Sequence, residues 1–425
     1  MTSRIASLQA RQIWDSRGRP TVEVDLALDS GAFGRAAAPA GASRGDNEAI
    51  DLRDGGDAFG GYGVARAVAN VNGEIARTLM GAPADQATVD ATLASLDGTP
   101  NFARLGGNAT VAVSLALLTA RAADAGLPLW RFLAGDEAVR IPLPEIQVFG
   151  GGAHAGRRTD IQDFMIMAPE AGTVRRALEI TADVYRAAGT LMADDGKLAG
   201  TADEGGWWPV FSSNEEGLGY LTRAIERAGY RPGQDVFISL DIAASEFYRD
   251  GTYQMALDDR RLAPEEMVEI VKRWCADYPI LSVEDPVSQH DAQGMRAVTE
   301  ALGEKIQIVG DDFLVTDAAR VENAARNGAC NCALIKVNQA GTVTRAKAAL
   351  EAAKKAGWAA IVSARSGETE DVFLSHLATG WNAGQIKVGS FARSERMAKW
   401  NELLRIEEAS NAVFAGWSAF PSLRR

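Results

Sequence analysis

The stretch 279-PILSVE-284 indicates the fold class of this chain, because it is a short apolar run that closes on a carboxylate. Helical patterns separate five further runs of this kind, which close on Asp241, Asp311, Lys336, Ser363 and Lys387. From Glu284 onward the closing residues lie 24 to 27 residues apart, the spacing of a strand followed by a helix. Parallel strands of a closed barrel carry their C-terminal ends to one mouth. We therefore predict an α/β barrel in which three carboxylates and two lysines converge at one mouth.

The composition is that of an ordinary folded enzyme. The chain has 425 residues, of which 47% are apolar and 24% charged, and its length allows two domains. Its formal net charge of −12 disfavours general binding to nucleic acid or to an anionic membrane, but not to a small anionic substrate. No apolar run reaches the length of a membrane span, and residues 1–18 lack the apolar core of a signal peptide. We expect a cytoplasmic protein.

The first part of the chain differs from the barrel segment in its pattern of apolar, polar and small residues. TVEVDLAL (21–28) alternates apolar and polar residues as a half-buried strand does, and the Gly-, Ala- and Ser-rich stretch 32–46 predicts a mobile loop. Helical patterns follow at 60–80 and 108–126. We place a domain boundary near residue 135, which gives an N-terminal domain over residues 1–135 and a barrel domain over 136–425. The last residues read as an appended tail.

The strand ends carry the groups of a metal-dependent acid–base site. Asp241, Glu284 and Asp311 offer hard oxygen ligands, which Mg²⁺ prefers. Any one of them alone is compatible with a helix cap or a surface carboxylate, whereas the three together favour a metal site. A lysine that is close to a cation and partly removed from water has its ammonium form disfavoured, and can act as a general base. Lys336 and Lys387 are both candidates, because spacing does not separate a base from an anion anchor.

Two other segments offer groups for a substrate. In SARSGETED (363–371), Arg365 provides a bidentate fork and Ser366 a hydroxyl for a phosphate or carboxylate. In TADEGGWWP (201–209), Glu204 lies in a glycine-rich turn. A carboxylic acid held there, beside Gln162 and Asp163 of IQDFM, can donate a proton to a leaving hydroxyl. A DEGG turn is common, so this pattern alone is weak.

These residues lie in motifs that closely resemble enolase, the Mg-dependent hydratase of glycolysis. The resemblance runs nearly end to end, through DSRGRPTVEV, AGASRG, GGNA, GGAHAG, QDFM, DEGG, DIAASEF, VEDP, GDDF, ALIKVNQAG, SGETED, GQIKVG and ARSERMAKWNELLRIEE. So many motifs in this order are highly specific. The family implies a small α+β N-terminal domain, an eight-stranded α/β barrel with irregular first turns, and a homodimer or higher homo-oligomer.

The resemblance also implies a role for each matching residue. Asp241, Glu284 and Asp311 would hold a first Mg²⁺, and Ser43 would help to carry a second that arrives with the substrate. Lys336 would remove the α-proton, and Glu204 would protonate the departing β-hydroxyl. Further substrate contacts would come from His154, Gln162, Asp163, Arg365, Ser366 and Lys387.

The chain departs from the family pattern near the expected phosphate site. Enolases read SHRSGETED there, whereas this chain has Ala364 in place of the histidine. The family loop SGASTG is here AGASRG, so that Ala40 replaces a serine and Arg44 a threonine. Asp163 replaces a glutamate, and Arg157 adds a positive charge. The lost imidazole and the added arginines favour a larger, more anionic phosphorus group, with Arg44 among its contacts.

We therefore predict a Mg-dependent dehydratase that acts on a 2-phosphoglycerate-like substrate. A modified phosphonate substrate is favoured, as in the carboxyphosphonoenolpyruvate synthase branch of the family, which serves phosphonate antibiotic assembly. One alternative is a glycolytic enolase that converts 2-phosphoglycerate to phosphoenolpyruvate, and a second is a non-catalytic enolase-like binding protein. The presence of Lys336, Glu204 and three strand-end carboxylates favours catalysis over binding alone.

Overall fold

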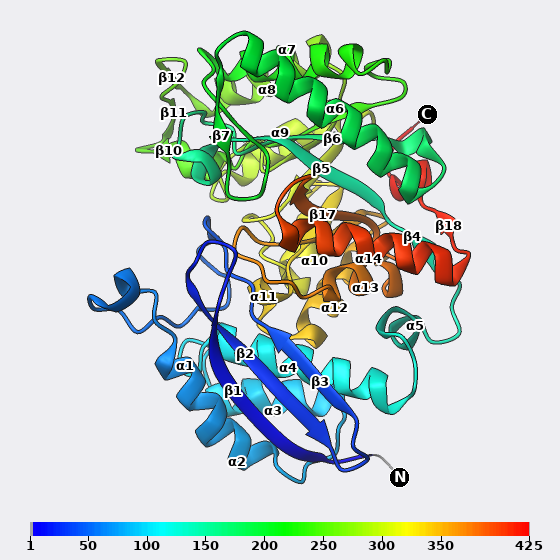
Figure 1. Ribbon diagram of the computed structural model, residues 1–425. Helices are drawn as coiled ribbons and strands as arrows, with labels where there is room; N and C mark the ends of the chain where they lie inside the picture. The colour runs from blue at the N-terminus through cyan, green and yellow to red at the C-terminus, as the bar shows by residue number, and fades with distance from the viewer. Residues whose placement is uncertain (1–2, 425) are drawn as a thin grey trace.

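Eight strands close into a barrel in this computed structural model, which describes residues 3–424 of the chain (Figure 1). The order around the ring is β5 (Leu143–Gly150), β6 (Asp163–Met167), β9 (Phe237–Asp241), β13 (Ile280–Glu284), β14 (Gln307–Gly310), β15 (Cys332–Ile335), β16 (Ala359–Ser363) and β17 (Gly384–Ser390). β17 pairs with β5 and closes the ring. β6 is antiparallel to both neighbours, whereas the other ring pairs are parallel. This confirms the predicted α/β barrel with irregular first turns.

The barrel strands are buried on both faces, because one face fills the barrel and the other meets the helices. Most of their residues are apolar, but the barrel interior also holds polar side chains such as Glu145 and Gln307. Cys332 and Leu334 of β15 belong to a small buried cluster with Val309 and Ile361, whereas Ala333 and Ile335 join the large core. Successive side chains of a strand point to opposite faces. The row of Cys332 and Leu334 therefore continues to Lys336, which reaches the mouth of the barrel.

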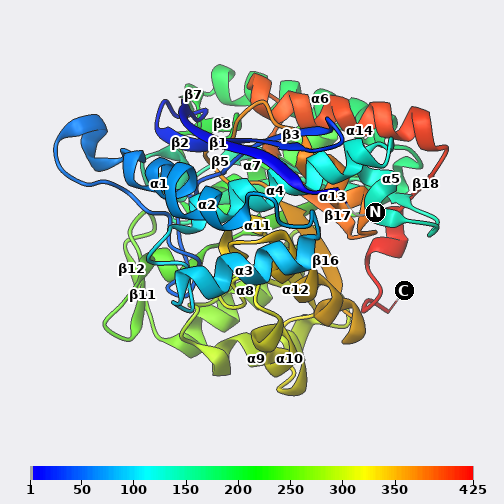
Figure 2. The same ribbon diagram turned by 90° about the horizontal axis from the view of Figure 1, so that it is seen from below.

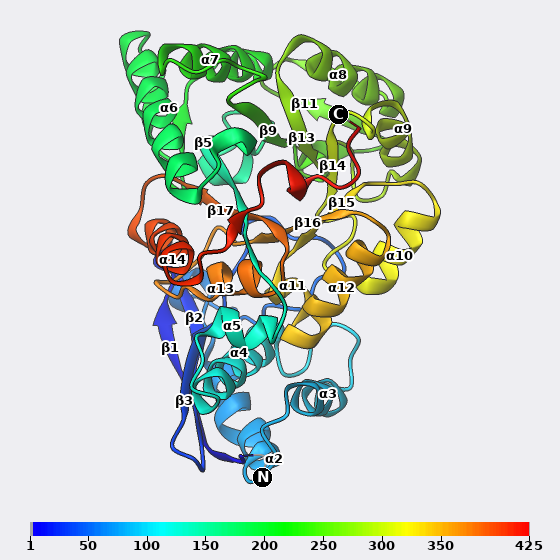
Figure 3. The same ribbon diagram turned by 90° about the vertical axis from the view of Figure 1, so that its right-hand side faces the viewer.

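Helices alternate with the strands and surround them (Figure 3). Five of them have an N-cap residue whose side chain accepts a hydrogen bond from a backbone N–H of the first turn. These N-caps are Thr173, Ser213, Asp291, Asp317 and Thr342. The helices are α6 (Val174–Asp194), α7 (Asn214–Arg227), α8 (Pro264–Asp277), α9 (Ala292–Leu302), α10 (Ala318–Arg326), α11 (Val337–Ala340), α12 (Val343–Lys355), α13 (Phe373–Gly380) and α14 (Ser394–Ser410). No helix within residues 3–424 has both the length and the apolar character needed to cross a bilayer.

The N-terminal domain is a three-stranded antiparallel sheet with helices on one side (Figure 2). Its strands are β1 (Ile5–Trp14), β2 (Pro20–Leu28) and β3 (Phe33–Ala37), and its helices are α1 (Ala65–Asn70), α2 (Ala76–Leu79), α3 (Gln86–Asp97), α4 (Gly107–Asp124) and α5 (Leu129–Ala134). A π-helical turn, Val71–Ile75, joins α1 to α2. The buried α4 packs on β2 and β3. The prediction of a loop over 32–46 was therefore wrong for Phe33–Ala37.

Small elements decorate the barrel. Two strands, β4 (Arg140–Ile141) and β18 (Val413–Phe414), pair with each other, so the C-terminal segment is packed against the start of the barrel domain rather than appended as a tail. A hairpin of β7 (Leu198–Thr201) and β8 (Trp207–Pro209) carries the DEGG turn. The remaining elements are β10 (Tyr248–Arg249), β11 (Thr252–Met255), β12 (Arg260–Leu262), and the 3₁₀ turns Ala58–Gly61, Gly152–Ala155, Pro169–Ala171, Ala244–Phe247 and Gly416–Ala419.

The N-terminal domain reaches the mouth of the barrel through the loop after β3. Ala40 and Gly367 exchange two backbone hydrogen bonds of 2.9 Å. Nearby, Ser16 N donates to Glu368 O at 2.8 Å, and Ala49 N donates to Gln339 O at 2.8 Å. The mouth is thus lined by segments of both domains.

Candidate active site

Strand register aligns several of the predicted polar residues on the inner side of the mouth. Asp163 lies opposite Asp241 in the β6–β9 pair, and Asp241 lies opposite Glu284 in the β9–β13 pair. The β16–β17 pair places Ser363 opposite Lys387. Because β6 is antiparallel, it brings its first residue to the mouth, and so Asp163 joins a row that otherwise consists of strand ends.

A small cavity opens at this mouth. Of the residues predicted for the site, it is lined by Ser43, His154, Gln162, Asp163, Glu204, Asp241, Lys336, Arg365, Ser366 and Lys387. Glu284 and Asp311 lie behind this lining, and each contacts a lysine that belongs to it. The structure therefore brings the predicted base, the predicted acid and the predicted phosphate contacts to one cavity.

The predicted metal ligands are paired with the two lysines. Lys387 Nζ lies 2.9 Å from Asp241 Oδ2 and 2.8 Å from Glu284 Oε2, while Lys336 Nζ contacts Asp311 Oδ2. Asp311 stands two residues beyond Val309, which is the Cα partner of Glu284, so it lies one step further toward the mouth.

Two other groups have their ligand atoms within 4.8 Å of one another in the described chain. One group is Asp285, Asp311 and Asp312, and the other is His154, Asp163 and Glu204. The predicted trio of Asp241, Glu284 and Asp311 does not form such a group in this arrangement: Lys387 bridges Asp241 and Glu284, whereas Asp311 pairs with Lys336. Asp285 serves the backbone instead, since its two oxygens accept from the N–H groups of Asp311 and Asp312 at 2.9 and 2.8 Å.

The chemistry of the trio nevertheless fits a divalent cation. Glu284 Oε1 and Gln162 Oε1 are buried and have no hydrogen-bond partner among residues 3–424. Burial and the neighbouring charge of Asp241 raise the pKa of Glu284 well above its usual value. A hard cation would satisfy the bare oxygens and relieve the crowding of acids. Asp241, Glu284 and Asp311 are the residues that would hold it.

The protonation of Lys336 differs from the expectation. Burial, the largest single influence, lowers its pKa, but the charges of Asp311 and Glu284 outweigh burial and raise the pKa above the ordinary lysine value. The prediction of a disfavoured ammonium form assumed a cation beside the lysine. With Asp311 free to pair with Lys336, the opposite direction holds.

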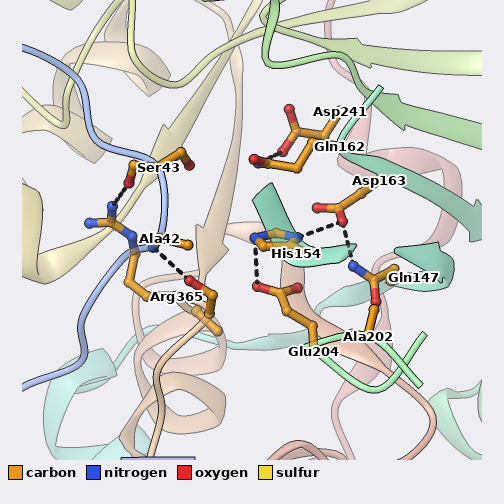
Figure 4. Close-up of polar contacts among 12 residues, drawn as sticks. Ala42, Ser43, Gln147, His154, Gln162, Asp163, Ala202, Glu204, Asp241 and Arg365 are labelled. Atoms are coloured by element: carbon orange, nitrogen blue, oxygen red, sulfur yellow. Dashed lines mark hydrogen bonds and ion pairs between the residues drawn. The ribbon is translucent and has the colours of Figure 1, made fainter. Parts of the chain in front are cut away.

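On the other side of the cavity, His154 lies between two carboxylates (Figure 4). His154 Nδ1 is 2.9 Å from Asp163 Oδ1, and its Nε2 is 3.7 Å from Glu204 Oε1. Burial lowers the pKa of His154, but Asp163 and Glu204 outweigh burial and raise the pKa to about 9. His154 is therefore a buried imidazolium at neutral pH. It fixes the predicted acid Glu204 relative to β6.

Aromatic packing holds the turn that carries Glu204. Tyr185 donates from its hydroxyl to Gly205 O at 2.8 Å, and Trp207 Nε1 donates to Tyr185 O at 2.8 Å. The two rings stack with centroids 4.5 Å apart. Gly205 has a φ of 97°, a conformation that favours glycine. These contacts with Tyr185 hold the DEGG turn in place against α6.

The predicted phosphate-binding end is made by both domains. Arg365 Nη2 donates to Ser43 O at 2.9 Å, and Ala42 N donates to Ser366 Oγ at 2.7 Å (Figure 4). Arg365 Nη1 also lies 2.9 Å from the buried Glu48 Oε2. Ala364 lines the cavity beside these groups. The guanidinium fork is consequently already held by a carboxylate, which the sequence did not predict.

Two arginines of the loops near the site, Arg44 and Arg157, lie beside carboxylates outside the cavity. Arg44 does not line the cavity, and its guanidinium lies 3.4 Å from Asp51, so its contact with a substrate stays a prediction. Arg157 is exposed and lies 2.8 Å from Glu246. Their charges are neutralised by carboxylates of their own surroundings. Of the other histidines, His290 is solvent-exposed beside Asp46, and His376 is packed near Glu402.

Sequence reasoning missed three polar residues that support the site. Gln147 donates to Asp163 Oδ1 and accepts from Gly206 N at 2.9 Å, which links β6 to the DEGG turn. Glu48 holds Arg365, and Gln339 contacts Asp311. The alternation of side chains along the strand could have indicated that Gln147 lies on the same face as the other polar residues of the barrel interior. For Glu48 and Gln339 no local signal exists, because their partners come from distant parts of the chain.

Comparison with known families agrees with this arrangement. The family model described as the N-terminal domain of enolase matches residues 5–133, and the family model described as the C-terminal TIM barrel domain of enolase matches residues 138–422. Together they span nearly the entire chain. The protein therefore belongs to the enolase family.

Proposed function

We propose that this protein is a Mg²⁺-dependent dehydratase that removes the α-proton and β-hydroxyl of a 2-phosphoglycerate-like substrate. The observation that carries the proposal is that Lys336, at the end of β15, and Glu204, in the β7–β8 turn, line one cavity. A base and an acid on separate elements can act on adjacent carbon atoms of one bound molecule. A protein that only binds its ligand would need neither.

Each reacting group has a defined task in this proposal. Lys336, once neutral, takes the α-proton, and Glu204, in its protonated form, delivers a proton to the leaving β-hydroxyl as water departs. Lys387 contacts the substrate carboxylate, and Arg365 with Ser366 contacts the phosphorus group. When bound by Asp241, Glu284 and Asp311, Mg²⁺ supplies positive charge that offsets the charge gained by the carboxylate as the α-proton leaves. Ser43 would help to hold a second Mg²⁺.

We further propose that the substrate carries a modified phosphorus group, of the kind used in phosphonate biosynthesis. Ala364 lines the cavity next to Arg365 where the family has a histidine, which leaves room and removes a hydrogen-bond donor. This favours a phosphonate analogue of 2-phosphoglycerate that bears an extra carboxylate. The location of the enzyme in the cytoplasm and its assembly as a homodimer or larger oligomer are part of the same proposal.

Turnover assays separate the substrates. Purified protein with Mg²⁺ is given 2-phosphoglycerate or its carboxyphosphono analogue, and the absorbance of the enolpyruvate product is followed. We expect the analogue to be the better substrate, and Ala364→His to improve turnover of 2-phosphoglycerate. Rates on 2-phosphoglycerate typical of a metabolic enzyme would instead assign the protein as a glycolytic enolase. Turnover of neither compound would favour a binding protein.

A further inference from the structure

Gln339, in the short helix α11, lies at the centre of a buried hydrogen-bond network. Only 3% of its surface is exposed. Its Nε2 donates to Asp311 Oδ1 at 2.8 Å and to Glu48 Oε1 at 3.2 Å, and its Oε1 accepts from Thr316 Oγ1 at 2.6 Å. The single carboxamide therefore joins residues of both domains, and each of its polar atoms has a partner.

One branch of the network leads to the proton-abstracting end of the cavity. Asp311 contacts the ammonium group of Lys336, and the backbone N–H of Lys336 donates to Thr316 Oγ1 at 2.9 Å. Gln339 and Thr316 together thus fix the carboxylate of Asp311 and the main chain of Lys336.

The other branch leads to the phosphorus-binding end. Glu48 accepts from Arg365 Nη1 at 2.9 Å and from Arg365 Nη2 at 3.2 Å. Its Oε1 also accepts from Gly45 N at 3.0 Å, within the loop that covers the cavity. The orientation of Arg365 consequently depends on a carboxylate that Gln339 holds in place.

The backbone that presents Thr316 is held in an unfavourable conformation. Val315 and Thr316 have φ values of 47° and 52°, and both are β-branched residues, for which positive φ is rare. Such residues persist only where the surrounding structure imposes them, and they cluster at functional sites. Here the conformation is what directs the Thr316 hydroxyl toward Gln339 and Lys336.

We infer that Gln339 is a positioning residue that couples the proton-abstracting end of the site to the phosphorus-binding end. A neutral carboxamide suits this place, because it donates to two carboxylates without adding charge. The inference rests on the proposed function for the meaning of the two ends, but the coupling itself belongs to the network of Asp311, Gln339, Glu48 and Arg365.

Binding measurements on three variants test the coupling. Calorimetry with Mg²⁺ alone and with 2-phosphoglycerate is applied to wild type, Gln339→Glu, Glu48→Gln and the double variant, with Gln234→Glu as an exposed control of the same chemical change. In Gln339→Glu, three carboxylates face one another and the hydrogen bonds of the amide are lost. We therefore expect Mg²⁺ and 2-phosphoglycerate both to bind about 10- to 100-fold more weakly than they bind to wild type. In the double variant the amide of residue 48 can donate to the new carboxylate at residue 339 but not to Asp311, so it should recover only the part of the change that comes from the contact between these two positions.

An effect of Gln339→Glu on only one of the two ligands, or purely additive effects in the double variant, would overturn the inference. Should Gln339→Glu fail to fold, Gln339→Met removes the same hydrogen bonds without a charge and must change both affinities. Because these readouts require no turnover, an inactive wild type would refute the proposed function while still testing the coupling. In an active enzyme, kcat and KM of Gln339→Met should both change, whereas those of Gln234→Glu should not.

Discussion

Lys336 and Glu204 line the same cavity and have different proposed tasks, so replacing each should stop a different step. We expect Lys336→Ala to abolish exchange of the substrate α-proton with solvent deuterium. Glu204→Gln should keep this exchange but lose about 10²- to 10⁴-fold in water elimination, the usual contribution of a general acid. NMR measures the exchange and product absorbance the elimination. Exchange at the wild-type rate in Lys336→Ala would show that the base is another residue.

His154 should make stability depend on pH. Its pKa is about 9 in the folded chain, against 6.5 for an unperturbed histidine, because Asp163 and Glu204 outweigh the cost of burial. The folded protein therefore binds more protons between these values, and the stabilisation from His154 is fully present below pH 6.5 and is lost as the pH rises to about 9. Urea unfolding of the metal-free protein from about pH 6 to about pH 9.5 should show this decline. His154→Gln should flatten it, and an unchanged slope in that variant would contradict the prediction.

At the scale of elements, the loop after β3 depends on a close approach to Arg365. A Cβ on Gly41 would lie 2.0 Å from Arg365 Nη2 and 2.7 Å from Ser43 O. We expect Gly41→Ala to break the contact between Arg365 and Ser43 and to raise KM about tenfold or more, since a hydrogen bond to a charged group contributes about 1.5–3 kcal/mol.

Gly219→Ala in α7 is the matched control for the loop, because a Cβ there meets nothing within 4 Å. Alanine favours the helix, so this variant should be slightly more stable and equally active. Steady-state kinetics and thermal unfolding of both variants make the comparison. A Gly41→Ala protein with unchanged KM would mean that the loop does not need this position for binding.

The repeat of strand and helix was predictable because each run from β9 onward is short, mostly apolar and closes on a polar residue. β3 was not, because Phe33–Ala37 is poor in typical strand residues and becomes a strand by pairing with β2 under α4. Gly34 shows this dependence, since a Cβ there would lie 2.1 Å from Ala116 O. Packing between distant segments, rather than local preference, decides such an element.

The site residues also divide into those that a local pattern predicts and those whose positions depend on packing between distant segments. Asp241, Glu284 and Lys387 follow from strand periodicity, because the ends of aligned strands must meet. The placement of Arg44 on Asp51 and of Glu48 on Arg365 depends on how a loop of one domain folds over the other. No periodicity within either domain carries that information.

At the scale of the whole molecule, the cavity requires both domains. Ala42 and Ser43 come from the N-terminal domain, while Arg365 and Ser366 come from the barrel, and direct hydrogen bonds join the two sets. The buried pair of Glu48 and Arg365 strengthens the same junction. The proposed binding of a phosphorus group at this end therefore depends on the same contacts that dock the two domains.

Metal binding should accordingly stabilise the whole molecule. A cation that binds only the folded chain at about 100 times its Kd contributes about 2.7 kcal/mol. With an unfolding entropy of about 2.1 cal/mol/K per residue, a chain of this length should then gain about 3 °C in Tm. We expect Mg²⁺ to raise Tm by this amount and a chelator to reverse the rise.

Glu284→Gln removes a proposed ligand and should reduce the Mg²⁺-dependent rise to less than about 1 °C, because a neutral amide is a weaker ligand for a hard cation. Glu145→Gln is the matched control. Glu145 is also a buried glutamate of the barrel interior, but it lies on β5, contacts Ser239 and is not a proposed ligand. Scanning calorimetry with and without Mg²⁺ compares the two variants. An equal loss of the Mg²⁺ effect in both would mean that the barrel interior as a whole, and not the strand-end carboxylates, governs cation binding.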